Sequence, residues 1–124
     1  MGTDRPFRFR WLGRVRYNDA LALQHGVVAQ SADDYLLLLE HHAVYTLGLR
    51  ATTEHLLAPP EEVGAELVRT DRGGDITFHG PGQLVGYPLL HLEGKGQGSM
   101  ADPVAYVCSV EDLIIGVCND LGLT

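Results

Sequence analysis

The central stretch of the sequence reads Asp71-Arg72-Gly73-Gly74-Asp75-Ile76-Thr77-Phe78-His79-Gly80-Pro81-Gly82-Gln83-Leu84-Val85-Gly86-Tyr87-Pro88. Two groups of glycines flank a short segment, and glycine both reaches backbone conformations closed to other residues and lets another backbone or a ligand come close. In an extended segment, alternate side chains point to opposite faces, so polar and apolar residues should separate. The polar face is expected to carry Asp75, Thr77 and His79, and the buried face Ile76 and Phe78. We interpret this polar row, held between two turns, as the functional site.

The composition indicates one small globular domain spanning residues 1–124. The chain has a mass of 13.5 kDa, with 45% hydrophobic and 20% charged residues, which are ordinary values for such a domain. Its formal net charge of −7 argues against nucleic acid or an anionic membrane as a partner. Arginines gather in the first sixteen positions, which is typical of a solvated strand or of an edge that binds an acidic partner. No signal-peptide pattern or membrane-length apolar run is present, so we expect a cytoplasmic protein.

Hydrophobic periodicity predicts alternating strands and helices, and hence an α/β or α+β fold with a mixed β-sheet and flanking helices. Strands are expected near residues 7–12, 35–40, 44–47, 66–70, 75–79 and 84–92, with helices near 17–30 and 103–121 and a helical turn near 52–57. The leucine run in the second strand predicts burial on both faces. Gly13 should turn the chain, Gly122 should cap the last helix, and Pro88 should lie at an edge, a bulge or a strand end. Residues 93–101 have the composition of a loop, and Asp102 should cap the helix that follows.

The two cysteines, Cys108 and Cys118, both fall in the predicted last helix. Ten residues at a rise of about 1.5 Å place them roughly 15 Å apart along it, whereas a disulfide needs Cα atoms within about 7 Å of each other. We therefore expect no bond between them and two buried thiols.

Several kinds of chemistry could use the central stretch. A phosphate-binding loop is disfavoured because no Lys-Ser/Thr pair follows the second glycine group, and the glycine spacing does not fit a dinucleotide fingerprint. A metal site could draw on Asp75, His79 and a further histidine, but no paired spacing typical of zinc is present. Asp75, Thr77 and His79 on one short strand cannot readily surround a nucleophile as a hydrolytic triad does. The plainest interpretation is structural, with glycines that form turns and a hydrogen-bonded, half-buried His79. The further histidines considered as ligands are His41, His42, His55 and His91.

The run from Arg72 to Tyr87 closely resembles the signature of the lipoyl(octanoyl) transferases, the octanoyltransferases of protein lipoylation. Two other stretches match the same family. They are Leu37-Leu38-Leu39-Glu40-His41 followed by Val44-Tyr45-Thr46-Leu47-Gly48, and Tyr17-Asn18-Asp19-Ala20-Leu21-Ala22-Leu23-Gln24. The resemblance covers nearly the whole chain from Tyr17 onward and outweighs the structural interpretation. It implies an architecture similar to the catalytic domain of biotin and lipoate protein ligases.

The resemblance implies transfer of an octanoyl group from octanoyl-acyl carrier protein to a lysine of a lipoyl domain, in 2-oxoacid dehydrogenases or in the glycine cleavage H protein. We expect no cofactor and no metal, and the net charge already argued against a nucleic acid or membrane partner. Main-chain donors beside the thioester carbonyl and an apolar wall for the eight-carbon tail suit this chemistry. The substrate-binding residues carried over from the family are Arg72, Gly73, Gly74, Asp75, Ile76, Thr77, Phe78 and His79. Tyr87 and His41 are further candidates for lining the pocket.

The chain departs from the family pattern in its catalytic residues. The family works through a cysteine that forms a thioester acyl-enzyme and a lysine that activates it, both in a segment that follows the helix ending here near Leu121. We therefore expect both residues beyond Thr124, the last residue of the sequence. Cys108 and Cys118 lack the Pro-Cys-Gly context of that cysteine, and Lys95 lacks the family's lysine motif, so none is assigned a catalytic role. We expect the chain to be the N-terminal part of such an enzyme, to hold half of the acyl pocket and to form no octanoyl thioester by itself.

Two other functions stay open on the sequence alone. An ATP-dependent lipoate or biotin ligase shares the implied architecture, although the Arg-Gly-Gly to His-Gly-Pro-Gly-Gln form favours the transferase. A non-catalytic module that binds acyl carrier protein or a lipoyl domain is the third hypothesis.

Overall fold

The computed structural model describes residues 5–56, 59–91 and 103–123. The chain divides into two compact units, residues 1–90 and residues 91–124. All the described strands belong to the first unit, together with one long helix, and the second unit contains the other. None of the described helices has the length and apolar character needed to span a membrane.

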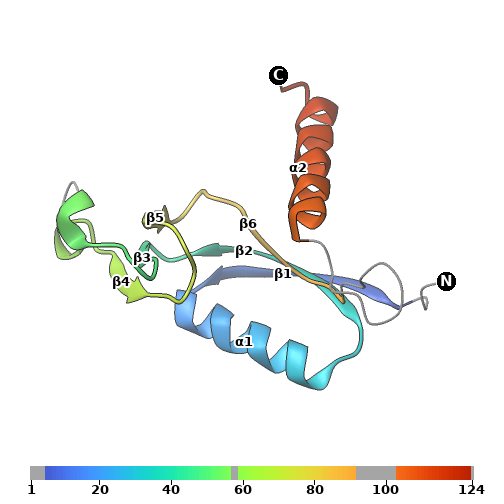
Figure 1. The fold of residues 1–124 in the computed structure, drawn as a ribbon, viewed down its shortest axis with the longest axis horizontal. Helices are drawn as coiled ribbons and strands as arrows, with labels where there is room; N and C mark the ends of the chain where they lie inside the picture. The colour runs from blue at the N-terminus through green and yellow to red at the C-terminus, as the bar shows by residue number, and fades with distance from the viewer. Residues whose placement is uncertain (1–4, 57–58, 92–102, 124) are drawn as a thin grey trace. The chain divides into compact units, whose positions relative to one another are not determined.

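Three strands of the first unit form one small mixed sheet (Figure 1). Strand β1 (Phe7–Val15) pairs in parallel with β2 (Asp34–His41), and β2 pairs antiparallel with β6 (Val85–Leu89). Because parallel neighbours need a crossover connection, helix α1 (Tyr17–Gln30) carries the chain from the end of β1 back to the start of β2. Ala20 of α1 is 1% exposed, so the helix contributes to the core at its first turn.

Gly13 does not turn the chain as predicted, because β1 continues through it to Val15. The register with β2 shifts between Trp11 and Arg14, and Gly13 has φ +72°. These are the features of a β-bulge, in which an extra residue is accommodated within a strand. A glycine in a strand pattern can therefore mark a bulge as well as a turn.

The other three strands form a second small mixed sheet. Strand β3 (Val44–Leu47) lies in the middle, parallel to β4 (Glu66–Arg69) and antiparallel to β5 (Ile76–His79). Two single-turn 3₁₀ helices, η1 (Thr53–His55) and η2 (Pro60–Glu62), lie between β3 and β4 in sequence. The mixed α+β fold class is confirmed, although the strands divide into two sheets of three.

The chain crosses between the two sheets twice, in neighbouring segments. Residues 40–43, which are the last two residues of β2 and the two that follow, lead into β3, and residues 80–84 lead from β5 back to β6. The antiparallel partners Leu39↔Val85 and Val44↔His79 bracket these crossings. We call residues 40–43 and 80–84 the junction, and the predicted site residues at the end of β5 lie beside it.

The leucine run of β2 is buried on one face only, which corrects the prediction of burial on both. Leu37 and Leu39 are 2% and 0% exposed, whereas Leu36 and Leu38 are half-buried. The half-buried face is continuous with exposed aromatic side chains of β1, because Phe9 is the register partner of Leu36 and Trp11 of Leu38. The largest fully buried side chains are Leu39, Leu47, His41, Val44 and Thr46, which places the core around β2, β3 and the junction.

Strand β6 is shorter than predicted and is an edge strand among the described residues, since it pairs with β2 alone. Pro88 sits opposite Leu36 in this edge strand. A proline cannot donate to a strand ladder and is tolerated where one side of the strand is unpaired. The prediction for Pro88 is confirmed.

Helix α2 (Pro103–Asp120) lies in the second unit and ends as the sequence predicts. Gly122 has φ +80°, the Leu123 N–H donates to the Cys118 carbonyl, and the Gly122 N–H donates to the Asn119 carbonyl. These two bonds make the Schellman arrangement that a C-terminal glycine allows. The predicted loop 93–101, the predicted cap Asp102 and the last residue, Thr124, lie outside the described residues.

The two cysteines are unpaired, as their separation along one helix predicts. Cys108 is exposed and Cys118 is partly exposed, so the prediction of buried thiols is wrong for the helix as the structure describes it. The helical pattern alone did not distinguish a buried face from an exposed one.

Candidate functional site

A tight turn, Gly80-Pro81-Gly82-Gln83, carries the chain through the junction after β5. The Gln83 N–H donates to the Gly80 carbonyl oxygen at 3.1 Å, and Gly82 has φ +91°. Proline at the second position and glycine at the third suit a type II turn, because the third position requires a positive φ. The Gly82 N–H also donates to Oε1 of Glu40 at 2.5 Å, which ties the turn to the end of β2.

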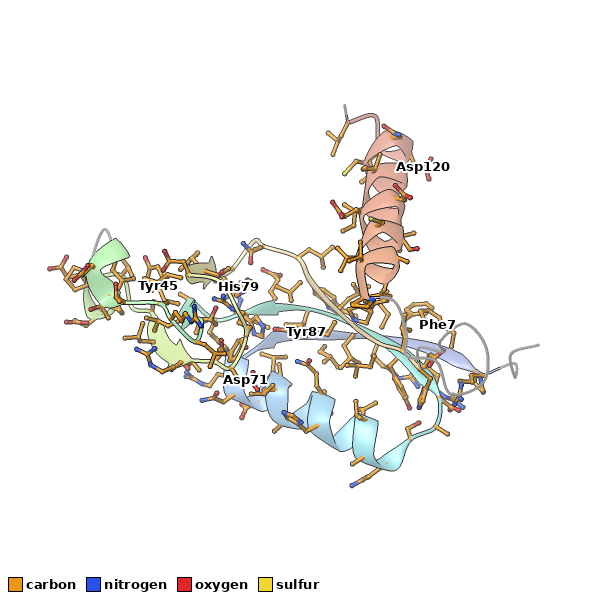
Figure 2. The ribbon with its side chains drawn as sticks, viewed as in Figure 1. Phe7, Tyr45, Asp71, His79, Tyr87 and Asp120 are labelled. Carbon is orange, nitrogen blue, oxygen red and sulfur yellow. The ribbon has the colours of Figure 1, made fainter. Side chains whose placement is uncertain are left out.

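His79 is the last residue of β5 and lies directly before this turn (Figure 2). Its side chain is half-buried, and Nδ1 lies 2.5 Å from Oε1 of Gln83. The ring also packs beside the ring of His41, with 5.8 Å between centroids. The turn therefore brings an amide, and the end of β2 brings a second imidazole, to the same histidine.

His41 is 0% exposed and has a partner on each ring nitrogen. Nδ1 lies 2.8 Å from the Val15 carbonyl oxygen and Nε2 lies 2.7 Å from the Tyr87 hydroxyl oxygen. A carbonyl can only accept, so Nδ1 donates to Val15 and the Tyr87 hydroxyl donates to Nε2. Burial lowers the pKa of His41; His79 and His42 add to this effect and the Val15 carbonyl opposes it. His41 is thus a neutral, fully hydrogen-bonded side chain.

Tyr87 comes from β6 and completes the bond to His41. Burial raises the pKa of Tyr87 to about 12, with a further contribution from Tyr17. The phenol therefore keeps its proton at neutral pH and is available as a donor. The Tyr17 ring from α1 lies 5.4 Å from the His41 ring, so three elements supply the packed group beside His79.

The guanidinium of Arg72 donates hydrogen bonds to other residues of the same chain. One terminal nitrogen donates to both the carbonyl oxygen and the hydroxyl oxygen of Thr46, each at 2.7 Å, and the other donates to the Gly73 carbonyl oxygen at 2.8 Å. Thr46 lies in β3 and is 1% exposed, so Arg72 fastens the loop before β5 to the middle strand of the second sheet. Charge-assisted bonds of this kind are about twice as strong as neutral ones.

The backbone of this loop approaches the end of β3 very closely. The Gly48 N–H donates to the Asp75 carbonyl oxygen at 3.2 Å, and the Leu49 N–H donates to the Arg72 carbonyl oxygen at 2.9 Å. A Cβ atom on Gly48 would lie 2.1 Å from the Gly74 carbonyl oxygen. Only glycine fits at position 48, and Gly74 itself adopts φ +90°. The loop is therefore held by close packing as well as by Arg72.

The predicted separation of polar and apolar residues along β5 is wrong at Phe78. Phe78 is 44% exposed and Thr77 is exposed, whereas Ile76 and His79 are both half-buried. Among the described residues β5 pairs only with β3, so Phe78 has a neighbouring strand on one side only, where it rests against the half-buried ring of Tyr45, 5.1 Å away between centroids.

The ten predicted site residues lie in two neighbouring parts of the structure, the junction and the segment formed by β5 and the loop before it. His79, His41 and Tyr87 meet at the junction. The other seven lie in β5 and in the loop before it, where Gly73, Gly74 and Asp75 are exposed. They are Arg72, Gly73, Gly74, Asp75, Ile76, Thr77 and Phe78.

The catalytic lysine and cysteine that the resemblance implies are expected beyond Thr124, so that prediction lies outside the described residues, which end at residue 123. The residues that the structure brings together are therefore candidates for binding the substrate, and the nucleophile stays a prediction.

Five residues of this region were not predicted as site residues. They are Tyr17, Glu40, Thr46, Gly48 and Gln83, and each makes a contact described above. All five fall within the three stretches that carry the family resemblance, which is the signal that could have identified them. For all of them except Gln83, the partners lie far away in sequence, so those contacts were not visible there.

The described residues include no group of three or more His, Cys, Asp or Glu side chains that could hold a metal ion. The histidines that do meet, His41 and His79, are engaged by Val15, Tyr87 and Gln83 as hydrogen-bonding groups.

Comparison with known proteins shows one consistent family. Residues 16–124 match the model of the lipoyl protein ligase A/B catalytic domain. The octanoyltransferase of Mycobacterium sp. (strain KMS) is 47% identical over 124 residues, which cover 98% of this chain and 48% of that protein. The octanoyltransferase of Nocardia farcinica (strain IFM 10152) is 46% identical over 117 residues, covering 91% and 43%. That of Geobacter metallireducens is 42% identical over 118 residues, covering 92% and 52%. The chain thus spans about half the length of the curated relatives it matches.

Proposed function

Because the chain belongs to the lipoyl protein ligase A/B catalytic domain family, we propose that its protein is an octanoyltransferase of protein lipoylation. The donor is octanoyl-acyl carrier protein, and the acceptors are lysines of lipoyl domains, including those of 2-oxoacid dehydrogenases and the glycine cleavage H protein. The observation that carries the proposal is the match to named octanoyltransferases over 90% or more of the chain, with the predicted stretch intact. We place the reaction in the cytoplasm, and we take the chain as the N-terminal part of the catalytic domain.

The loop before β5 supports the acyl thioester in this proposal. Gly73 and Gly74 are exposed and carry no side chain, so a carbonyl oxygen can approach the backbone N–H groups there. Arg72 contributes by fixing the loop, since its guanidinium is bound to Thr46 and Gly73. We therefore keep Arg72 in the substrate site as a residue that shapes it.

Exposed apolar side chains before and after the turn at residues 80–83 suit the octanoyl tail. Phe78 and Leu84 are 44% and 67% exposed, and they lie on either side of the turn at residues 80–83. Burying a methylene group is worth about 0.8 kcal/mol, so covering most of an eight-carbon tail supplies substantial binding energy. Exposed apolar groups of this kind gain from being covered by a ligand.

The chemical step needs a nucleophile that we do not assign within the described residues. Cys108 and Cys118 lie in α2, in the second unit, and neither has the sequence context of the family's cysteine. We propose that the family's cysteine and lysine follow Thr124 in the complete protein. The residues proposed here bind and orient the acyl group.

The direct test uses the protein expressed from its complete reading frame. It is incubated with octanoyl-acyl carrier protein and an unmodified lipoyl domain, without ATP, and the lipoyl domain is analysed by mass spectrometry. We expect one octanoyl group on one lysine. Modification that requires ATP and free octanoate or lipoate would identify a ligase, and binding without any modification would identify a non-catalytic module. Either result overturns the proposal.

A further inference from the structure

The side-chain amide of Gln83 has an orientation fixed by two different partners. Its Nε2 donates to the Phe78 carbonyl oxygen at 3.4 Å, and its Oε1 lies 2.5 Å from Nδ1 of His79. A carbonyl oxygen only accepts, so the nitrogen end of the amide must face Phe78 and the oxygen end must face His79. The amide oxygen is also an acceptor only, so Nδ1 of His79 must carry a proton.

This bond determines what the other ring nitrogen of His79 can do. In a neutral imidazole only one nitrogen carries a proton, and the hydrogen bond made by one nitrogen selects the state of the other. With the proton on Nδ1, Nε2 has a free lone pair. Nε2 has no hydrogen-bond partner among the residues that the structure describes, and the side chain is half-buried rather than enclosed.

The position of Gln83 is itself set by the turn and by Glu40. Gln83 is the fourth residue of the turn, and its N–H closes the turn on Gly80. The preceding residue, Gly82, has the positive φ that directs the chain, and its N–H is held by the Glu40 carboxylate. The amide of Gln83 therefore reaches His79 from a turn that is closed by its own hydrogen bond and tied to Glu40.

The other ionisable groups near His79 come from two neighbouring strands, β2 and β6, and are already engaged. His41 on β2 lies beside it, is buried and has its pKa lowered, so it adds no positive charge near neutral pH. Tyr87 on β6 keeps its proton, and its O–H donates a hydrogen bond to Nε2 of His41. Glu40 on β2 accepts the Gly82 N–H. The Gln83 amide is therefore the described group that selects the tautomer of His79.

We propose that Gln83 is a positioning residue that holds His79 in its Nδ1-protonated tautomer, so that His79 offers Nε2 as a hydrogen-bond acceptor to an N–H group of a substrate. The inference rests on the proposed function and deepens it. It assigns His79 to binding a donor group, and it leaves the acyl carbonyl oxygen to the exposed main-chain N–H groups before β5.

Two substrate groups have the required chemistry. The pantetheine arm that carries the acyl group on its carrier protein contains amide N–H groups, and the acceptor lysine presents an amine when it attacks. Both are N–H donors, and both approach the thioester. Separate KM measurements for the carrier protein and for the lipoyl domain distinguish the two groups, because each group belongs to a different substrate.

The tautomer can be measured directly and without activity. The protein is labelled with ¹⁵N on histidine, and long-range ¹H–¹⁵N correlation spectra at neutral pH distinguish a protonated nitrogen from an unprotonated one. We expect Nδ1 of His79 to be the protonated nitrogen. Gln83→Leu, which removes the acceptor, should shift the signals toward Nε2 protonation, whereas Gln83→Glu, which keeps an acceptor oxygen, should retain Nδ1 protonation. Gln30→Glu, on the exposed end of α1, adds the same charge elsewhere and is the matched control.

Kinetics of the octanoyl transfer then identify the donor. Gln83→Leu should raise KM by about 10-fold for one substrate, since losing one hydrogen bond of about 1.4 kcal/mol corresponds to that factor. A rise for the carrier protein assigns the pantetheine amide, and a rise for the lipoyl domain assigns the lysine.

The outcomes that overturn the inference are distinct from a failure of the proposed function. Protonation of His79 at Nε2 in the unmodified protein contradicts the tautomer. A spectrum unchanged by Gln83→Leu contradicts the positioning role of Gln83. A tautomer shift that leaves both KM values unchanged contradicts the role in substrate binding. An absence of octanoyl transfer in the unmodified protein contradicts the proposed function while the spectra still report on Gln83 and His79.

Discussion

At the scale of single residues, His41 links the core to the site. It is wholly buried, yet both ring nitrogens are satisfied by groups from β1 and β6. A buried polar group is tolerated only when it is hydrogen-bonded. Burial of His41 therefore requires β1 and β6 to lie where they supply its two partners. The His41 ring also contacts the half-buried rings of His79 and Tyr17, so this buried residue helps to position the side chains of the site.

The lowered pKa of His41 makes the stability of the protein depend on pH. The unfolded chain takes up a proton near the ordinary value of 6.5, whereas folded His41 takes it up only at lower pH. Between these two values the unfolded state binds more protons, so the free energy of unfolding falls as the pH falls. We expect urea unfolding from about pH 7.5 to about pH 5.5 to show this loss, starting near the unfolded value.

The variant His41→Asn keeps a donor for Val15 and removes the titrating group. It should be less stable at every pH, and its loss of stability between neutral and mildly acid pH should be smaller than in the unmodified protein. Equal slopes for the two proteins would contradict the assignment to His41. His25→Asn, at an exposed position on α1, is the control and should leave the slope nearly unchanged.

Arg72 is expected to contribute mainly through the loop that it fixes. Arg72→Lys keeps the charge but loses the forked geometry that reaches Thr46 and Gly73 together. We expect a loss of about 1–2 kcal/mol in the free energy of unfolding, measured in urea. Arg50→Lys, at an exposed position, should change it little. An unchanged stability for Arg72→Lys combined with a large rise in KM would show that Arg72 binds substrate directly.

At the scale of elements, the loop before β5 depends on a contact that only glycine permits. Gly48→Ala places a Cβ atom 2.1 Å from the Gly74 carbonyl oxygen, so the backbone must move. We expect a loss of about 2–3 kcal/mol in the free energy of unfolding, together with reduced octanoyl transfer. Calorimetry and the mass-spectrometric transfer assay measure the two effects.

Gly26→Ala provides the matched control for this variant. Gly26 lies inside α1, and an added Cβ atom meets nothing within 4 Å. Alanine is preferred to glycine within a helix, so this change should raise stability by about 0.5–1 kcal/mol. Similar effects of the two substitutions would show that the loop does not need the close approach at Gly48.

The elements that sequence predicted well are those with strong local patterns. The bounds of α1, the strand at Val44–Leu47 and the C-terminal glycine of α2 follow from periodicity and capping. Local pattern could not separate a bulge from a turn at Gly13, because glycine suits both. It also could not show that the Phe78 side chain would be exposed, since this depends on how many strands flank β5.

At the scale of the whole molecule, the contacts that shape the site join residues far apart in sequence. Glu40 bonds to Gly82 across 42 positions, and Arg72 to Thr46 across 26. Nothing in the sequence between them signals these pairs, so the family resemblance located the region while the structure supplied the connections. The resemblance was informative because the stretches that carry it are the ones that meet at the junction and in the loop before β5.

The central claim is that the octanoyl group lies against the loop before β5 and the strand itself. The most direct measurement loads acyl carrier protein with an octanoyl analogue bearing a diazirine at the end of its chain, irradiates it with the complete protein, and maps the crosslink by peptide mass spectrometry. We predict crosslinks within residues 72–84, concentrated at Phe78 and Leu84, and competition by unlabelled octanoyl carrier protein. Competable crosslinks confined to α2 or to β1, with none in residues 72–84, would contradict the account.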